Sequence, residues 1–126
     1  MSASEFRTFE ELECWKAGRE LCKWASKQSQ TFPNEEKFVL CSQLNRAARS
    51  VTANIAEGYG RFHYQENIQF CRQARGSAYE VLAHLITAFD EGYLNEEMLA
   101  AGRSLVETVV KLTNGYIRYI EKQKTQ

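Results

Sequence analysis

The fold of this chain is decided by residues 40–55, which read LCSQLNRAARSVTANI. Apolar side chains recur there at intervals of three and four residues, so they share one face of a helix. These side chains are Leu40, Leu44, Ala47, Ala48, Val51 and Ile55. The stripe predicts an amphipathic helix that buries this face against other helices.

Outward from this stripe, the sequence predicts three more helices. The four segments cover about residues 9–30, 34–57, 63–91 and 95–122. The breaks between them contain Pro33, Gly58 and Gly92. We expect Gly58 to end its helix in the left-handed conformation and Asn95 to cap the last helix. Helices of this length joined by short loops predict an all-α, antiparallel, up-down-up-down four-helix bundle, a single domain over residues 1–126.

The last predicted helix has an unusually wide apolar arc. One stripe consists of Met98, Leu105, Val109, Leu112, Tyr116 and Ile120, and a second beside it of Leu99, Val106, Val110, Thr113 and Ile117. A helix in a hairpin buries only one stripe, so the spare surface predicts a second contact, with another copy of the chain. The alternative is a partly exposed helix on a monomer.

Charge is balanced overall but uneven along the chain. The sequence has 16 basic and 16 acidic residues, so its net charge gives no footprint of nucleic-acid or membrane binding. Residues 41–76, however, hold five arginines against two glutamates. The arginines are Arg46, Arg49, Arg61, Arg72 and Arg75. They are the candidate nucleic-acid-binding residues, and the alternative is an ordinary solvated helix surface.

Helical phase separates these arginines. Arg46 and Arg49 are predicted to point away from the core, and Arg72 also lies off its core stripe. Arg75 is nearer the boundary and could pair with Glu80 across a helix–helix contact. Arg61 falls in the loop between the second and third helices with aromatic residues on both sides, an arrangement that suits a phosphate backbone or unstacked bases.

Polar side chains flank the apolar stripes of the two middle helices. They are Gln43, Ser50 and Asn54 on the second helix, and Gln73, Ser77, Glu80 and His84 on the third. Such stripes are typical of helix–helix contacts, where they form hydrogen bonds and fix the register; a ligand site is the alternative. Glu80 and His84 are four residues apart, which predicts a local hydrogen bond.

The sequence contains no recognisable catalytic or metal-binding motif. Four cysteines lack CxxC spacing, and neither His63 nor His84 follows a glutamate by three residues, as a di-iron bundle requires. We interpret Cys14, Cys22, Cys41 and Cys71 as small buried apolar residues in a reducing compartment. No secretory signal or membrane-spanning run is present, so we expect a cytoplasmic protein. Because catalytic and metal-binding motifs are lacking, we also expect that the protein needs no cofactor and is not an enzyme.

One extended motif resembles a known family. It consists of residues 43–48 (QLNRAA), 50–51 (SV) and 54–61 (NIAEGYGR), followed by Glu66, Phe70, Ala74, Gly76, Ser77 and Glu80. With these residues the chain is similar to the S23/IVS family, bacterial four-helix-bundle proteins first noted as reading frames within intervening sequences of 23S ribosomal RNA genes. Trp15, Phe32-Pro33 and Glu36 also fit, and the resemblance covers about residues 6–121.

The resemblance implies assembly and nucleic-acid binding. The family is similar to the accessory variability protein of diversity-generating retroelements, which forms barrel-shaped homopentamers that bind nucleic acid and a partner reverse transcriptase. The matching signature positions of this chain are Arg46, Asn54, Glu57, Gly58, Arg61, Ser77 and Glu80. Two positions depart from the family pattern: Asn45 stands where a second arginine is common, and His63 where a serine often caps the third helix.

These observations lead to one main hypothesis and two alternatives. The main hypothesis is a non-enzymatic homo-oligomer, a pentamer, that binds structured RNA or an RNA/DNA hybrid as an accessory to a reverse transcriptase. The first alternative is a structural or protein-interaction module whose arginines form salt bridges between subunits. The second is an enzyme whose catalytic groups come together only between subunits.

Overall fold

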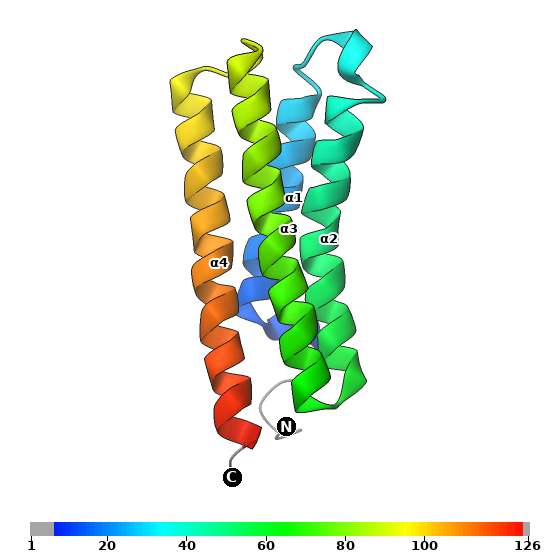
Figure 1. Ribbon diagram of the computed structural model, residues 1–126, viewed down its shortest axis with the longest axis vertical. Coiled ribbons are helices and arrows are strands. Elements are labelled where there is room, and N and C mark those ends of the chain that lie inside the picture. Colours follow the sequence, from blue (N-terminus) through cyan, green and yellow to red (C-terminus); the bar gives the residue numbers. More distant parts are fainter. Residues whose placement is uncertain (1–6, 125–126) are drawn as a thin grey trace.

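The computed structural model describes residues 7–124, and the predicted domain ends at residues 1 and 126 lie outside this range. Four α-helices make up most of it (Figure 1). They are α1 (Glu13–Ser29), α2 (Leu40–Arg61), α3 (Tyr64–Asp90) and α4 (Glu96–Lys124), with short 3₁₀ turns η1 (Phe9–Glu11) and η2 (Asn34–Glu36). Residues 7–124 contain no strand, as the all-α prediction requires.

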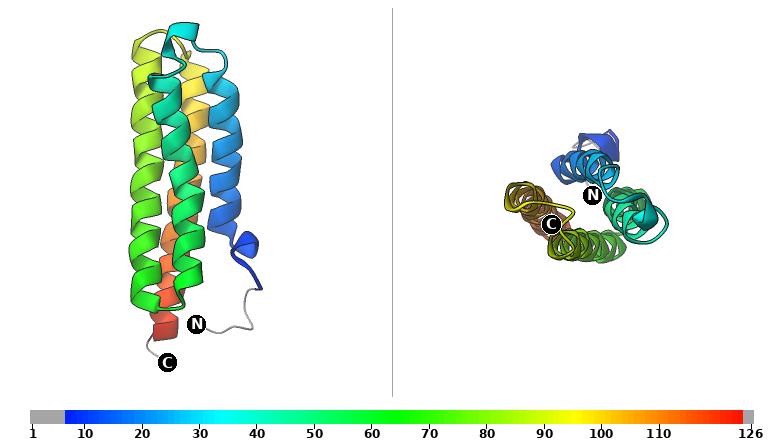
Figure 2. Two further views of the ribbon diagram at one scale, coloured as in Figure 1. Left: turned by 90° about the vertical axis from the view of Figure 1, so that its right-hand side faces the viewer. Right: turned by 90° about the horizontal axis from the view of Figure 1, so that it is seen from above.

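Consecutive helices run in opposite directions and form a four-helix bundle (Figures 1 and 2). Helix α2 packs against α1 and α3, and helix α4 packs against α1 and α3 from the other side. The predicted bundle is therefore confirmed. No helix within residues 7–124 is long and apolar enough to cross a membrane.

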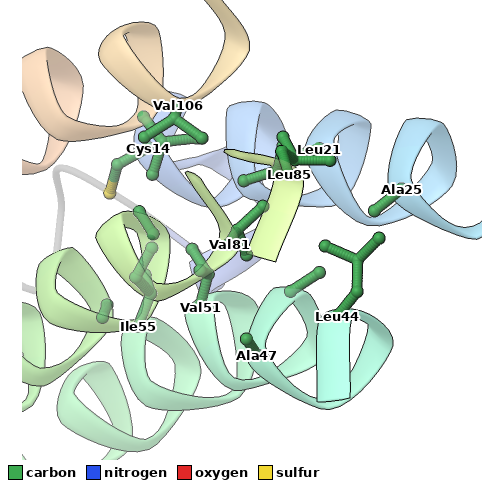
Figure 3. Close-up of a cluster of buried hydrophobic side chains, with 14 of the residues drawn as sticks. Cys14, Leu21, Ala25, Leu44, Ala47, Val51, Ile55, Val81, Leu85 and Val106 are labelled. Carbon is green, nitrogen blue, oxygen red and sulfur yellow. The ribbon is translucent and has the colours of Figure 1, made fainter. Parts of the chain in front are cut away.

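The core contains the predicted stripe of α2, whose six apolar residues are all buried. Leu44, Val51 and Ile55 meet side chains of α1, α3 and α4, among them Leu21 and Leu85 (Figure 3). Burying a side chain of this size contributes about 1.5–3 kcal/mol to folding, so this stripe is a major source of stability.

The wide apolar arc of α4 is used inside the bundle. Its residues are buried or half-buried against the core, because α4 contacts both α1 and α3 and needs one stripe for each. The apolar surface left on this helix is thus smaller than predicted, and it comes from half-buried residues such as Leu105 and Leu112. The contact with another copy of the chain stays a prediction. The described large apolar residues that are exposed lie elsewhere; they are Phe38, Val39, Phe62, Tyr79 and Ile86.

Helix α2 begins six residues later than predicted. Residues 34–36 form η2, and Val39, at φ −117° and ψ −95°, separates this turn from the helix. A helix continuing from Asn34 would place Lys37 seven and fourteen residues before Leu44 and Val51, on the buried face. Burying an unpaired ammonium group is costly, and the break instead leaves Lys37 exposed.

Helix α2 also ends four residues later than predicted, at Arg61 rather than Glu57. Gly58 lies within the helix, so its assignment as the left-handed cap is wrong. A β-carbon at Gly58 would lie 2.8 Å from Asn67 Oδ1 and 2.9 Å from Phe70 Cβ. Gly58 thus permits the close approach of α3, and Phe62, with φ 59°, is the residue that reverses the chain.

The turn between α3 and α4 follows the prediction. Gly92 has φ 83°, and the amides of Gly92 and Tyr93 donate to the carbonyls of Phe89 (3.0 Å) and Ala88 (2.8 Å). This pair of bonds is a Schellman motif. Asn95 Oδ1 then accepts from the Met98 amide at 2.8 Å, which confirms Asn95 as the cap of α4.

Candidate nucleic-acid interface

The five candidate arginines do not form one cluster. Arg46 and Arg49 line a groove between α1 and α2, whereas Arg61 lies at the turn into α3. Arg75 Nη1 donates to Asn114 Oδ1 on α4 at 2.6 Å, and Arg72 is exposed on α3. The predicted partnership of Arg75 with Glu80 is wrong, because Arg75 faces α4 whereas Glu80 faces α2.

The partner of Glu80 is Arg46. Arg46 Nη2 on α2 pairs with Glu80 Oε2 on α3, and 61% and 38% of the two side chains are exposed. The same carboxylate oxygen lies 3.1 Å from His84 Nε2, which is the predicted local hydrogen bond. Hydrogen bonding from His84, and then the charge of Arg46, holds the pKa of Glu80 below its usual value of 4.5.

The remaining polar residues between these helices form the α2–α3 seam, which we define as Ser50, Asn54, Ser77 and Glu80 with their partners. The hydroxyls of Ser50 and Ser77 lie 2.9 Å apart across the two helices. Asn54 Nδ2 donates to the carbonyl oxygen of Ser50 at 2.8 Å and to its hydroxyl at 3.0 Å. The two polar stripes therefore meet as predicted, although Gln43 and Gln73 are exposed.

Arg61 is held within the turn by its own neighbours. Its guanidinium contacts Glu57 at 3.1 Å and Glu66 at 3.6 Å, and it lies 5.1 Å from the ring centroid of Phe70. These contacts pair its charge and leave Phe62 exposed beside it. Together with the position of Gly58, they place most of the signature residues in the contact between α2 and α3.

A groove of about 710 Å³ is lined by residues of α1, α2 and the segment that connects them. Figure 2 shows this connection crossing from α1 to α2 at one end of the bundle. Lys37, Arg46 and Arg49 supply its positive charge, and Phe32 and Phe38 supply aromatic surface. Its polar lining residues are Ser26, Ser29, Gln30, Asn34, Ser42 and Asn45. We call this surface the α1–α2 groove.

The chain around the groove is poor in negative charge. Residues 21–34 and 37–56 contain no aspartate or glutamate. Glu35 and Glu36 lie between these two ranges: Glu35 is exposed, and Glu36 accepts hydrogen bonds from Tyr93 Oη at 2.8 Å and from the Leu40 amide at 3.4 Å. Glu80 of α3 pairs with Arg46 and does not line the groove. The first turn of α2 lines the groove through Cys41 and Ser42, and the first amides of a helix favour anions. The groove is therefore suited to a negatively charged ligand.

Two members of this surface were absent from the sequence prediction. Lys37 and Phe38 lie outside the arginine-rich stretch of residues 41–76, and they reach the groove because of the break before α2. The available signal was the position of Lys37, seven residues before Leu44 on a face that otherwise carries apolar residues. A lysine at a position that would be buried predicts that the helix begins after it.

The cysteines have the environment expected of structural residues. Burial raises the pKa of Cys14 and of Cys71 to about 12, and it also raises the pKa of Cys22 and Cys41. Thiols of this kind are poor nucleophiles and poor metal ligands at neutral pH. In the described part of the chain, no three or more histidine, cysteine, aspartate or glutamate side chains are grouped so that they could hold a metal ion.

The fold and the α1–α2 groove together define a small four-helix-bundle protein whose α1–α2 groove is basic and partly aromatic. The sequence model of the 23S rRNA-intervening sequence protein matches residues 10–115. Because the match spans most of the chain, this protein belongs to the 23S rRNA-intervening sequence protein family. No curated protein matches it.

The fold also resembles a solved structure. It is the 1.70 Å crystal structure of a protein of unknown function from the S23 ribosomal protein family of Bacteroides thetaiotaomicron. The TM-score is 0.75 and the sequence identity is 22%, over 82% of this chain and 97% of that chain. At this identity the likeness concerns the fold alone.

Proposed function

We propose that this protein is a non-catalytic RNA-binding protein that works as a homo-oligomer and binds RNA in the α1–α2 groove. The observation that carries the proposal is the groove itself, where Lys37, Arg46 and Arg49 converge and no acidic side chain among residues 7–124 contributes to the lining. Phosphate contacts by lysine and arginine dominate the affinity of proteins for nucleic acids.

The cations of the groove are available to a ligand. Arg49 makes no ion pair with any residue in the range 7–124, and Lys37 is exposed. Arg46 pairs with Glu80, but exposed ion pairs of this kind contribute only about 0–1 kcal/mol. A phosphate group can therefore replace the carboxylate at little cost.

Assembly would multiply the effect of a single groove. The net charge of one chain is zero, so a ring of copies would present a strong positive surface only if the grooves face the same side. Tyr79 and Ile86 are exposed on α3, opposite the groove side of the bundle core, and offer apolar surface for subunit contacts. A pentamer is the form that the family resemblance suggests, and its mass would be five times the 14.5 kDa of the chain.

The proposed protein partner is a reverse transcriptase, to which this protein would be an accessory. This part of the proposal rests on the family resemblance alone. The genes on either side of the coding sequence test this role. A neighbouring reverse transcriptase gene with its repeat pair supports the accessory role, and placement within a ribosomal RNA gene contradicts it.

The alternative function is a protein-interaction module without RNA binding. Specific ion pairs favour it, since Arg46 and Arg61 are already neutralised by glutamates. In that case the exposed arginines form salt bridges between subunits, and their removal dissociates the oligomer. RNA affinity would then be undetectable for every variant.

A salt titration of RNA binding tests the proposal. We expect the affinity of the wild-type protein for a folded RNA to fall steeply as salt rises. In Arg46→Ala/Arg49→Ala, the slope of log affinity against log salt should be shallower by about 1.4, since each phosphate contact contributes about 0.7. Arg72→Ala/Arg103→Ala removes the same two positive charges from exposed positions of α3 and α4, outside the groove, and is the matched control.

The readouts separate the two functions. Light scattering should give the same mass for wild-type protein and the double variant. Urea unfolding should give free energies within about 1 kcal/mol of each other, because the variant loses only the exposed ion pair between Arg46 and Glu80. Absence of RNA binding by the wild-type protein at low salt would refute the proposal. A double variant that dissociates, with RNA binding undetectable for both proteins, would favour the interaction module.

A further inference from the structure

We infer that the α1–α2 groove binds an unpaired nucleotide of a folded RNA, with its base stacked on Phe38, and does not bind the side of a duplex. This inference rests on the proposed RNA-binding function and specifies its ligand.

The first observation is the exposure of Phe38. Its exposed fraction is 84%, and the ring lies at the edge of a groove that also holds three cations. Lys37 Nζ is 5.4 Å from the ring centroid. The exposed ring still has ample surface for a planar base, and aromatic side chains beside cations are the usual platform for unpaired bases.

The second observation is the local backbone. Phe38 lies between η2 and α2, where Val39 interrupts the helical conformation. The same break removes Lys37 from the core face and brings Lys37 and Phe38 to the groove together. A phosphate and the base attached to the same nucleotide are neighbouring groups, and in this segment adjacent residues, Lys37 and Phe38, offer a contact for each.

The third observation is an ordered amide in the lining. Asn45 Nδ2 donates to Ser29 Oγ and to the Cys41 carbonyl, both at 3.0 Å. These bonds fix the orientation of the amide, and among residues 7–124 no donor is bonded to its Oδ1. A free carbonyl oxygen can accept from the Watson–Crick edge of an unpaired base, which is already occupied in a duplex.

The size of the groove agrees with this ligand. A volume of about 710 Å³ is a recess for one or a few nucleotides, between two helices that are joined at one end by their connection. The faces of bases in a duplex are covered by their stacked neighbours, so a duplex cannot stack on Phe38 without extruding a nucleotide. An unpaired base needs no base pair to be broken, and only its weak stacking on neighbouring bases is lost when it binds.

The test compares a stem–loop RNA with the same stem closed as a blunt duplex, at one salt concentration and with intact protein. Loss of one stacked base costs about 1–3 kcal/mol, so Phe38→Ala should weaken stem–loop binding by about 5- to 150-fold. Duplex binding should stay unchanged. Phe38→Trp should retain stem–loop affinity, and Val39→Ala, which removes an adjacent exposed apolar side chain, is the matched control.

A second readout reports stacking directly. The fluorescence of 2-aminopurine placed in the loop should be quenched by the wild-type protein and by Phe38→Trp, but not by Phe38→Ala. The mass of each variant in light scattering shows whether Phe38 is instead a subunit contact. Dissociation of Phe38→Ala into smaller species overturns the inference.

The failure of this inference differs from the failure of the proposed function. If Phe38→Ala weakens stem–loop and duplex binding equally, or neither of them, the unpaired-nucleotide site is refuted. The proposed function survives that result as long as Arg46→Ala/Arg49→Ala still weakens RNA binding. If the wild-type protein binds neither RNA at low salt, both fail.

Discussion

The two sides of helix α2 use their polar residues in different ways. On the side of α3, polar groups are paired within the chain: Ser50 with Ser77, Asn54 with Ser50, and Arg61 with Glu57. On the side of α1, the groove holds Arg49 without an ion pair to any residue in the range 7–124, and an exposed Lys37.

This difference separates residues that build the bundle from residues that are free to bind. Polar groups that satisfy one another across two helices set the register of packing. Cations that lie together without carboxylates repel one another and destabilise the fold slightly. The same cations can stabilise a bound anion. The α2–α3 seam should therefore control stability, and the α1–α2 groove should control affinity.

The largest expected effect is on the seam side, at Gly58. Gly58→Ala places a methyl group 2.8 Å from Asn67 Oδ1 and 2.9 Å from Phe70 Cβ, so α3 must move away. We expect a loss of about 2 kcal/mol in the free energy of unfolding, measured in urea. Gly60→Ala is the control, because within residues 7–124 no atom beyond its chain neighbours and the backbone of its own helix lies within 4 Å of its β-carbon position. That variant should gain up to about 1 kcal/mol from helix propensity. Equal effects at both positions would contradict a packing role for Gly58.

A smaller effect is expected for the hydroxyl pair of the seam. Ser77→Ala leaves the half-buried hydroxyl of Ser50 without its partner across the helices, although Asn54 still donates to it. We expect unfolding to become easier by about 1 kcal/mol, the usual contribution of such a bond. Ser104→Ala makes the same change at an exposed position of α4 and should be neutral or slightly stabilising. A neutral Ser77→Ala would show that the bond is replaced by water.

The smallest effect concerns the pH dependence that Glu80 confers. Its pKa is lowered in the folded state, first by the hydrogen bond from His84 and then by Arg46. This stabilisation is present above the unfolded value of about 4.5 and is lost as pH falls through the lower folded pKa. Glu80→Gln should flatten the stability profile in this acidic range by less than about 1 kcal/mol, because the carboxylate is partly exposed.

Urea unfolding at a series of pH values measures this effect. Glu107→Gln is the matched control, since Glu107 is exposed on α4 and has no ion pair among residues 7–124. If both variants flatten the profile equally, the effect arises from net charge and is not specific to the seam.

Sequence periodicity predicted the helices and much of their contact chemistry. The stripe around Leu44 and Val51 gave the buried face of α2 correctly, and the phase of Ser50 and Ser77 brought the two polar stripes together. These features succeed because helical side-chain direction follows from position alone. The cap at Asn95 was also predictable, since its bond is local.

Features that depend on a second helix were not predictable in the same way. Gly58 has the sequence appearance of a helix end, but its role is set by how closely Asn67 and Phe70 approach it. The pairing of Glu80 with Arg46 and not Arg75 depends on which neighbour each side of α3 faces. The wide apolar arc of α4 likewise needed two neighbours inside one chain to cover it.

The sequence by itself determined an all-α bundle, its buried stripes and a middle segment rich in arginine, because these depend on helical period and composition. Only the tertiary structure decided which cations are paired and which remain together in the α1–α2 groove. The physical reason is distance, because an arginine is paired only when a carboxylate lies beside it in space, as Glu80 lies beside Arg46 and Glu57 beside Arg61. The break before Leu40 likewise brings Lys37 and Phe38 to the groove.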